Sequence, residues 1–400
     1  MESSTASVEG STGLPGLKEL QTRFLFPFFI DRQALSRSVE NLESASLAGM
    51  RGAWVAADPP GLYKDELVDH AATYLFGKRE AGQEKGCRYL RLSEKAANRI
   101  FHNLVVALRD HPEFRVSLVP AAGCELFLTD QGTGVLSLAL EPALQPGDVS
   151  GAIDFNYLFA RTHGGPGAEI RSPHPSEDQA KWNAIKEEHR AKIAPAPSPN
   201  APIEVRLGVA GGRFTLDELL EELLRPLASC DFRKIQRGLS IYSIAHLDHT
   251  ADYDDATCRR ALGPFLLALT QIEEPSHAGA ISSLDAVPNE ILNRRHWTAS
   301  GLMASVHLVS DQAPGEGRRA VEFNQQRAIR IRDKYFVPYL IAYLQKVALQ
   351  RALDDTGKIA SSPDRDTSAK SLSALRDNLL EFGVNGHFPQ VSSRHVLHRY

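Results

Sequence analysis

The sequence predicts an α/β fold in which a mixed β-sheet is flanked by helices and followed by a long C-terminal stalk helix. Apolar runs of strand length alternate with helical spacing in the first third of the chain. A β-hairpin pattern follows at 124–142, and one long helical pattern begins at Phe323. With 400 residues, of which 42% are hydrophobic, the chain can bury a large core. We therefore expect a disordered tail at 1–20, an α/β domain at 21–322 and a helical stalk at 323–400.

The first elements follow from short apolar runs. Residues 24–30 (FLFPFFI) predict a strand buried on both faces, and Pro27 favours an edge strand or a bulge. Residues 51–57 predict a strand and 62–76 a helix. Residues 94–110 predict a helix, which the pair His111-Pro112 ends before a strand at 114–120.

The hairpin is the clearest local pattern. Two apolar arms flank the turn sequence TDQGTG, in which Gly132 and Gly134 are expected to supply positive φ angles. After it, residues 163–204 are rich in Pro, Gly and charge, which predicts a flexible insertion. Thr215, with Glu218 three residues later, predicts a capping box at the start of a helix.

The second half repeats the mixed pattern. Residues 239–247 and 302–310 predict strands, with a helix expected at 258–274 between them. In the long helix, Phe336, Leu340, Tyr343 and Val347 form a narrow apolar seam that suits packing on other helices.

Composition excludes several classes of protein. The net charge of −4 gives no overall attraction to nucleic acid. The four cysteines include no CxxC pair, which favours a reducing compartment. The N-terminus lacks the pattern of a signal peptide, and no segment has the roughly 18 to 20 apolar residues that cross a bilayer. We therefore expect the chain, as given, to be cytoplasmic.

The motifs of common enzymes are absent from the sequence. Because it has neither the hydrolase nucleophile elbow nor a phosphate-binding loop, we expect that it is no enzyme.

Residues 244–255 (IAHLDHTADYDD) hold the strongest candidates for metal binding. Imidazole and carboxylate groups directly after a predicted strand could bind a divalent ion. Aspartates at this place also commonly cap the helix that follows. One alternative is therefore a metal-dependent hydrolase that uses His246, Asp248 and His249. The candidate metal ligands are His246, Asp248, His249, Asp252, Asp254 and Asp255.

Several arginine clusters suggest a second alternative. Arginine binds phosphate through paired hydrogen bonds, although such clusters more often form ion pairs or a solvated face. The groups include 233–237, 259–260, 294–295 and 327–332. They leave open a soluble signalling module that responds to a nucleotide.

The order of elements resembles the cytosolic portion of a CorA-like divalent-cation transporter. The resemblance is carried by the hairpin ELFLTDQGTGVLSLALEP and the helix RDKYFVPYLIAYLQKVALQRAL. It covers about residues 20 to 400 without the insertion. The Gly-Met-Asn pore signature of that family is absent, and GLMAS at 301–305 does not replace it. No pore residue can therefore be assigned.

The resemblance implies an oligomeric membrane protein. In that family an α/β lobe leads into a stalk helix and two membrane helices, and the protein assembles as a homopentamer. We expect membrane helices beyond Tyr400, which would place the protein in the inner or plasma membrane. The lobe would act as a sensor that binds Mg²⁺ between subunits, with Asp252, Asp254 and Asp255 as candidate ligands by their chemistry. Some CorA-like proteins are thought to respond to a nucleotide instead.

Overall fold

The computed structural model covers the chain with gaps. It describes residues 16–47, 50–64, 67–77, 86–101, 104–108, 113–120, 123–160, 168–171, 212–235, 239–247, 255–271, 289–293, 296–301, 303–310, 329–361 and 369–377. The strands are β1 (Leu17–Phe29), β2 (Ser46–Leu47), β3 (Met50–Arg51), β4 (Trp54–Ala56), β5 (Cys87–Leu92), β6 (Leu104–Leu108), β7 (Phe114–Leu118), β8 (Cys124–Thr129), β9 (Thr133–Pro142), β10 (Ala168–Arg171), β11 (Arg213–Phe214), β12 (Arg233–Lys234), β13 (Ser240–Leu247), β14 (Asn289–Asn293), β15 (His296–Ser300) and β16 (Ala304–Ser310).

Helices cover both faces of the sheet. The α-helices are α1 (Leu35–Ser44), α2 (Asp69–Phe76), α3 (Glu94–Phe101), α4 (Val149–Ala160), α8 (Leu216–Leu224), α9 (Asp255–Gln271) and α11 (Phe336–Ala360). Shorter turns are the 3-10 helices η1 (Arg32–Ala34), η2 (Gly61–Tyr63) and η4 (Arg225–Cys230), and the π-helical turn η6 (Ile331–Tyr335) that leads into α11.

Among the described residues, fourteen strands form one mixed sheet, and the fold is α/β as predicted. The main path of the sheet runs β11-β10-β6-β7-β9-β1-β13-β16-β15-β14. The pairing of β13 with β16 is parallel, and the other pairings are antiparallel. Strand β9 pairs with β1 along one edge, and its other edge is shared by β8 and β7. The sheet therefore forks at β9.

Strand β1 lies at the centre of this sheet and is buried on both faces, as its apolar run predicts. Phe24, Phe26 and Phe28 belong to the core on one face, and Leu25 to the core on the other. The expectation that Pro27 marks an edge or a bulge is wrong. Pro27 lies where the neighbour on one side changes from β13, which pairs up to Leu25, to β12, which pairs from Phe28. A residue without an N–H is tolerated there because neither β13 nor β12 pairs with it, while β9 pairs with it on the other side through Val135.

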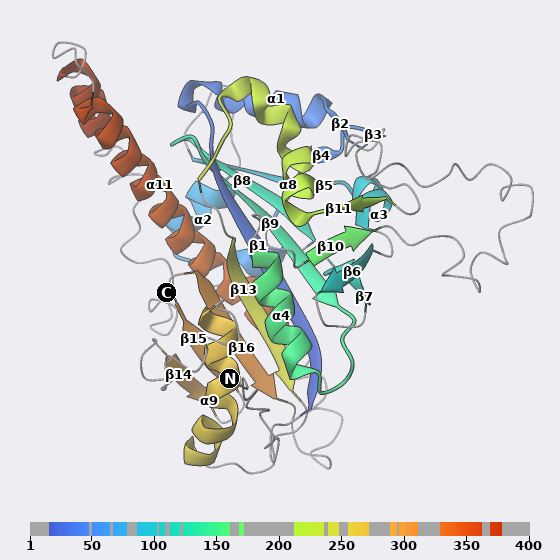
Figure 1. The fold of residues 1–400 in the computed structure, drawn as a ribbon. Coiled ribbons are helices and arrows are strands. Elements are labelled where there is room, and N and C mark those ends of the chain that lie inside the picture. The colour runs from blue at the N-terminus through green and yellow to red at the C-terminus, as the bar shows by residue number, and fades with distance from the viewer. Residues whose placement is uncertain are drawn as a thin grey trace, which may run out of the picture.

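Two cores lie on opposite faces of the sheet (Figure 1). The larger core contains apolar side chains of α1, α3, α4, α8 and α9. The second contains those of η2, α2 and the first half of α11. Figure 1 shows α4 and α9 in front of the sheet, and α11 crossing its other face and extending past its upper edge. The start of α11 is therefore placed directly on the sheet.

The apolar seam of the long helix is covered by the same chain. Phe336, Leu340, Tyr343 and Val347 are all buried in the core between α11 and the sheet. The prediction that this seam packs on other helices is wrong, because a spacing of three and four residues fits a sheet face as well as a helix. Of the predicted stalk at 323–400, residues 323–328, 362–368 and 378–400 lie outside the described residues.

Three other expectations change at element boundaries. The helix predicted at 94–110 ends at Phe101, and the apolar run LVVAL forms β6 instead. The predicted tail is too long, because β1 begins at Leu17. Within the predicted insertion, Ala168–Arg171 form β10, which pairs with β6 and buries Ile170. The rest of that insertion and residues 1–15 lie outside the described residues.

The local turn and cap patterns were informative. The capping box is confirmed: the Thr215 side chain accepts from the backbone of Glu218, and the Glu218 side chain accepts from the backbone of Thr215. The hairpin is also confirmed, with Gly132 at a φ of +69°. Gly134 does not have a positive φ. It lies in β9 against the Phe28 ring, where a Cβ would collide with that ring.

Candidate functional site

The residues predicted to bind metal are only partly described. His246 lies near the end of β13, and Asp255 is the first residue of α9. The other four candidates, Asp248, His249, Asp252 and Asp254, lie outside the described residues. In the ranges given above, no three His, Cys, Asp or Glu side chains are grouped to hold a metal ion. The cluster at 244–255 stays a prediction.

His246 shares its sheet face with a layer of polar side chains. Strand alternation places it on the face of Tyr242 and Ile244, which belong to the α11 core. Directly opposite, on β1, lies Glu19. Glu19, Gln21 and Arg23 follow one another at every second position and so line the same face. This polar layer continues toward the start of α11.

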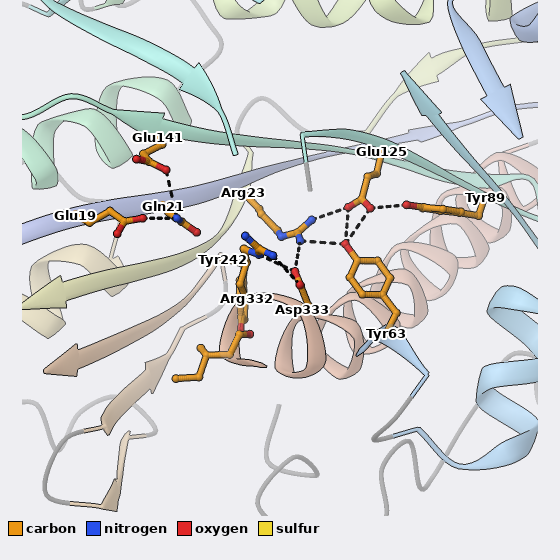
Figure 2. A network of polar contacts seen from close by, with 11 residues as sticks. Glu19, Gln21, Arg23, Tyr63, Tyr89, Glu125, Glu141, Tyr242, Arg332 and Asp333 are labelled. Atoms are coloured by element: carbon orange, nitrogen blue, oxygen red, sulfur yellow. Dashed lines mark hydrogen bonds and ion pairs between the residues drawn. The ribbon is translucent and has the colours of Figure 1, made fainter. Parts of the chain in front are cut away.

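The outer part of the layer contains two carboxylates that share one amide. Gln21 Nε2 donates to Glu19 Oε1, and also to Glu141 Oε2 at 3.3 Å (Figure 2). Burial and the nearby Glu19 carboxylate raise the pKa of Glu141, while Gln21 and Arg332 act in the opposite direction. These side chains are half-buried. They form the part of the layer nearest to solvent.

The inner part is a buried charged network around Arg23. Arg23 Nη1 lies 2.6 Å from Glu125 Oε2, and Arg23 Nη2 donates to the Tyr63 hydroxyl at 3.0 Å. Tyr63 in turn donates to Glu125, and the Tyr89 hydroxyl donates to Glu125 Oε1 at 2.5 Å. Arg23 and Glu125 are 3% and 0% exposed. A substrate cannot reach these groups in this conformation, so their role here is to hold elements together.

The protonation states fit this role. Burial lowers the pKa of the Arg23 guanidinium, but the nearby oxygens of Tyr63, Glu125 and Asp333 raise it by more. The net effect is a raised pKa, so Arg23 keeps its charge. Burial and the Glu125 carboxylate raise the pKa of the Tyr89 hydroxyl. Burial is also the main cause that raises the pKa of the Tyr63 hydroxyl. The network therefore keeps a charged guanidinium and two neutral hydroxyl donors around one carboxylate.

The same network fixes the start of the long helix. Asp333, in the π-helical turn, lies 3.5 Å from Arg23 Nη2 and accepts two hydrogen bonds of 2.8 Å from Arg332. The Arg23 guanidinium also lies 4.0 Å from the centre of the Phe336 ring. Figure 2 shows these groups converging from β1, β8 and the start of α11. Any movement of the first turn of α11 would separate buried opposite charges.

A second anchor lies four turns further along α11. Arg351 Nη1 donates to three backbone carbonyls, of Ile30 at 2.9 Å, Gln131 at 3.0 Å and Gly132 at 2.5 Å. Its guanidinium lies 5.3 Å from the centre of the Phe29 ring. Burial, first among several causes, lowers the pKa of Arg351. The helix is thereby tied to the end of β1 and to the hairpin turn.

Beyond this anchor, α11 leaves the sheet. It continues from Arg351 to Ala360, and Figure 1 shows this end projecting past the domain. Leu349 is 50% exposed and Leu353 is 72% exposed. Among the described residues, no helix or strand covers these two leucine side chains. Of the helices that the structure describes, none combines the length and apolarity of a membrane span.

Sequence reasoning missed both anchors. Arg23 directly precedes the strand predicted at 24–30, and Glu125 lies in the first arm of the predicted hairpin. Neither was considered for a site, although a charge beside or inside a buried strand is a signal for a buried partner. Arg332 was considered for phosphate and instead pairs with Asp333. In the basic group at 233–237, Lys234 pairs with Asp217 at 3.0 Å. Comparisons with family models, curated proteins and solved structures find no match to this chain.

Proposed function

We propose that this chain is the regulatory head of an oligomeric CorA-like membrane effector or divalent-cation transporter. In this proposal α11 is a lever that carries the state of the sheet to neighbouring copies. One observation supports it above the others: α11 is docked on the sheet between two anchors and then projects with exposed leucines. Residues 352–360 extend about 14 Å past the second anchor, so this end of the helix can carry a movement beyond the head.

The first anchor suits a switch because buried charges favour discrete states. If Asp333 moved away, Arg23 would lose one of its two carboxylate partners in a dry environment, which costs several kcal/mol. Intermediate positions of α11 are therefore unfavourable, and the helix is either docked or released. The half-buried carboxylate of Glu141 lies close enough to Arg332 to affect its own pKa, so an ion or ligand bound at Glu141 would change the charge near the Arg332–Asp333 pair.

Contact between copies would use the projecting end of α11. The seam between the anchors is already covered by the sheet, so Leu349 and Leu353 are the apolar groups left for it. They are four residues apart and lie on one side of the helix. Assembly through them would place the moving end of the lever at the subunit contact.

The test is the mass of the assembly. Native mass spectrometry of the full chain at increasing concentration is expected to show an oligomer that Mg²⁺ tightens. The variant Leu349→Glu/Leu353→Glu is expected to be monomeric. Val55→Glu, at an exposed apolar residue of β4, serves as the control and should assemble as the wild type does. A chain that stays a single subunit at high concentration, with and without Mg²⁺, contradicts the proposal.

A further inference from the structure

A pair of buried histidines joins two neighbouring strands near the start of α11. His296 in β15 and His307 in β16 are both buried, and His296 Nε2 lies 3.0 Å from His307 Nδ1. The Tyr335 ring, in the turn before α11, lies 6.0 Å from the His296 ring at an angle of 20°. These histidines are separate from the residues 244–255 that the sequence singled out.

The distance between the two nitrogens matches a pair of ligands on one metal ion. Imidazole binds transition metals at about 2.0–2.1 Å, so two nitrogens at a right angle on one ion are about 2.9 Å apart. Tetrahedral ligands are about 3.3 Å apart by the same geometry. The observed 3.0 Å lies close to both values, so a rotation of the two rings that turns their nitrogens toward a common point would let both bind one ion.

The His307 ring is in the form that metals bind. Burial lowers the pKa of His307 to about 3, so its imidazole is neutral at physiological pH. A neutral imidazole offers a lone pair, whereas an imidazolium offers none. In the hydrogen bond between the rings, one of the two facing nitrogens carries a hydrogen. When an ion binds, that ring would shift the proton to its other nitrogen, so that both facing nitrogens have a lone pair for the ion.

A third donor lies beside the pair. Thr298 is directly opposite His307 in the β15–β16 pairing and two residues from His296, so all three side chains share one sheet face. Thr298 Oγ1 is buried and has no hydrogen-bond partner among the residues that the structure describes. Buried hydroxyl groups normally have such a partner, and this one lies on the same sheet face as the two imidazoles.

We propose that His296 and His307 form a binding site for a late first-row transition-metal ion, such as Cu²⁺, Ni²⁺ or Zn²⁺, with Thr298 as the adjacent oxygen donor. Two nitrogen ligands select this class over Mg²⁺ and Ca²⁺, which prefer oxygen. This site does not depend on the proposed role of α11, and its test leaves that role untouched.

The test uses Cu²⁺ as the probe on the full-length protein. With one equivalent of Cu²⁺, electron paramagnetic resonance is expected to show hyperfine coupling to two imidazole nitrogens. His296→Gln and His307→Gln are each expected to weaken Cu²⁺ binding at least tenfold and to lose one coupled nitrogen. His70→Gln, at an exposed histidine of α2 that belongs to neither metal prediction, is the control and should behave as the wild type. Equal binding and spectra in all four proteins would overturn the proposal.

A second variant keeps the test decisive if the glutamine variants do not fold. Thr298→Val keeps the shape of the side chain and removes an oxygen that makes no hydrogen bond to the residues that the structure describes, so we expect the fold to be retained. Weaker Cu²⁺ binding with both nitrogens still coupled is expected. An unchanged affinity, together with no two-nitrogen coupling in the wild type, would reject the site.

Discussion

Arg23 on the central strand and Glu125 on β8 form an ion pair of 2.6 Å in which neither side chain is more than 3% exposed. Removing one member of a buried pair leaves the other charge without compensation. We expect Glu125→Gln to lower the free energy of unfolding by about 3–5 kcal/mol, measured by urea denaturation. Glu169→Gln is the control, because its pair with Arg213 is exposed and contributes at most about 1 kcal/mol. Equal losses in both variants would contradict this assignment.

The helix that begins after Thr215 offers a prediction on local structure. Its capping box satisfies two backbone N–H groups, those of Thr215 and Glu218. Thr215→Ala removes one of these acceptors and is expected to cost about 1 kcal/mol of unfolding free energy. Thr215→Ser keeps the hydroxyl and should lose much less unfolding free energy than Thr215→Ala. A comparable loss in both variants would show that the methyl group, and not the cap, matters.

These two sites also show what sequence can predict. The capping box and the hairpin depend on residues within a few positions of each other, and both were predicted. The partner of Arg23 lies 102 positions away, and no local pattern identifies it. The run LVVAL is apolar throughout, so its spacing does not separate a strand from a helix. The seam of α11 was recognised as buried, but its partner is decided by tertiary packing.

Glu141 predicts a dependence of stability on pH. Its pKa is raised in the folded protein above its usual 4.5, so the folded state binds the proton more tightly than the unfolded state. Wild-type stability therefore falls as pH rises from about 4.5 through the folded pKa. Glu141→Gln lacks this loss and is expected to be more stable than wild type at pH 7, with the difference shrinking toward pH 4. Urea midpoints at both pH values measure it, with the exposed Glu113→Gln as control. A difference independent of pH would contradict the assignment.

Arg351 is expected to hold the second half of the docked helix. Arg351→Met keeps an apolar stem near Phe29 but removes the donor for three carbonyls. We expect a loss of about 1–3 kcal/mol, because at least one buried carbonyl is left unsatisfied. Amide hydrogen exchange should become faster at 348–360 and stay slow at 336–347, which the sheet covers. Uniformly faster exchange along α11 would mean that the two anchors are not independent.

The crowding at Gly132 gives an independent test of the same anchor. Its φ of +69° disfavours any side chain, and a Cβ would collide with Arg351 Nη1 and lie 2.7 Å from the Ile30 carbonyl oxygen. Gly147 has a φ of +82° but no atom within 4 Å of such a Cβ, so Gly147→Ala isolates the backbone strain. We expect Gly132→Ala to cost clearly more unfolding free energy than Gly147→Ala. In Gly132→Ala/Arg351→Met the clash with Arg351 is gone and the close contact with the Ile30 carbonyl remains. The double variant should therefore lose less unfolding free energy than the two single variants lose together. Strict additivity would show that Gly132 and Arg351 do not act through one contact, and the anchor would then rest on the other carbonyls alone.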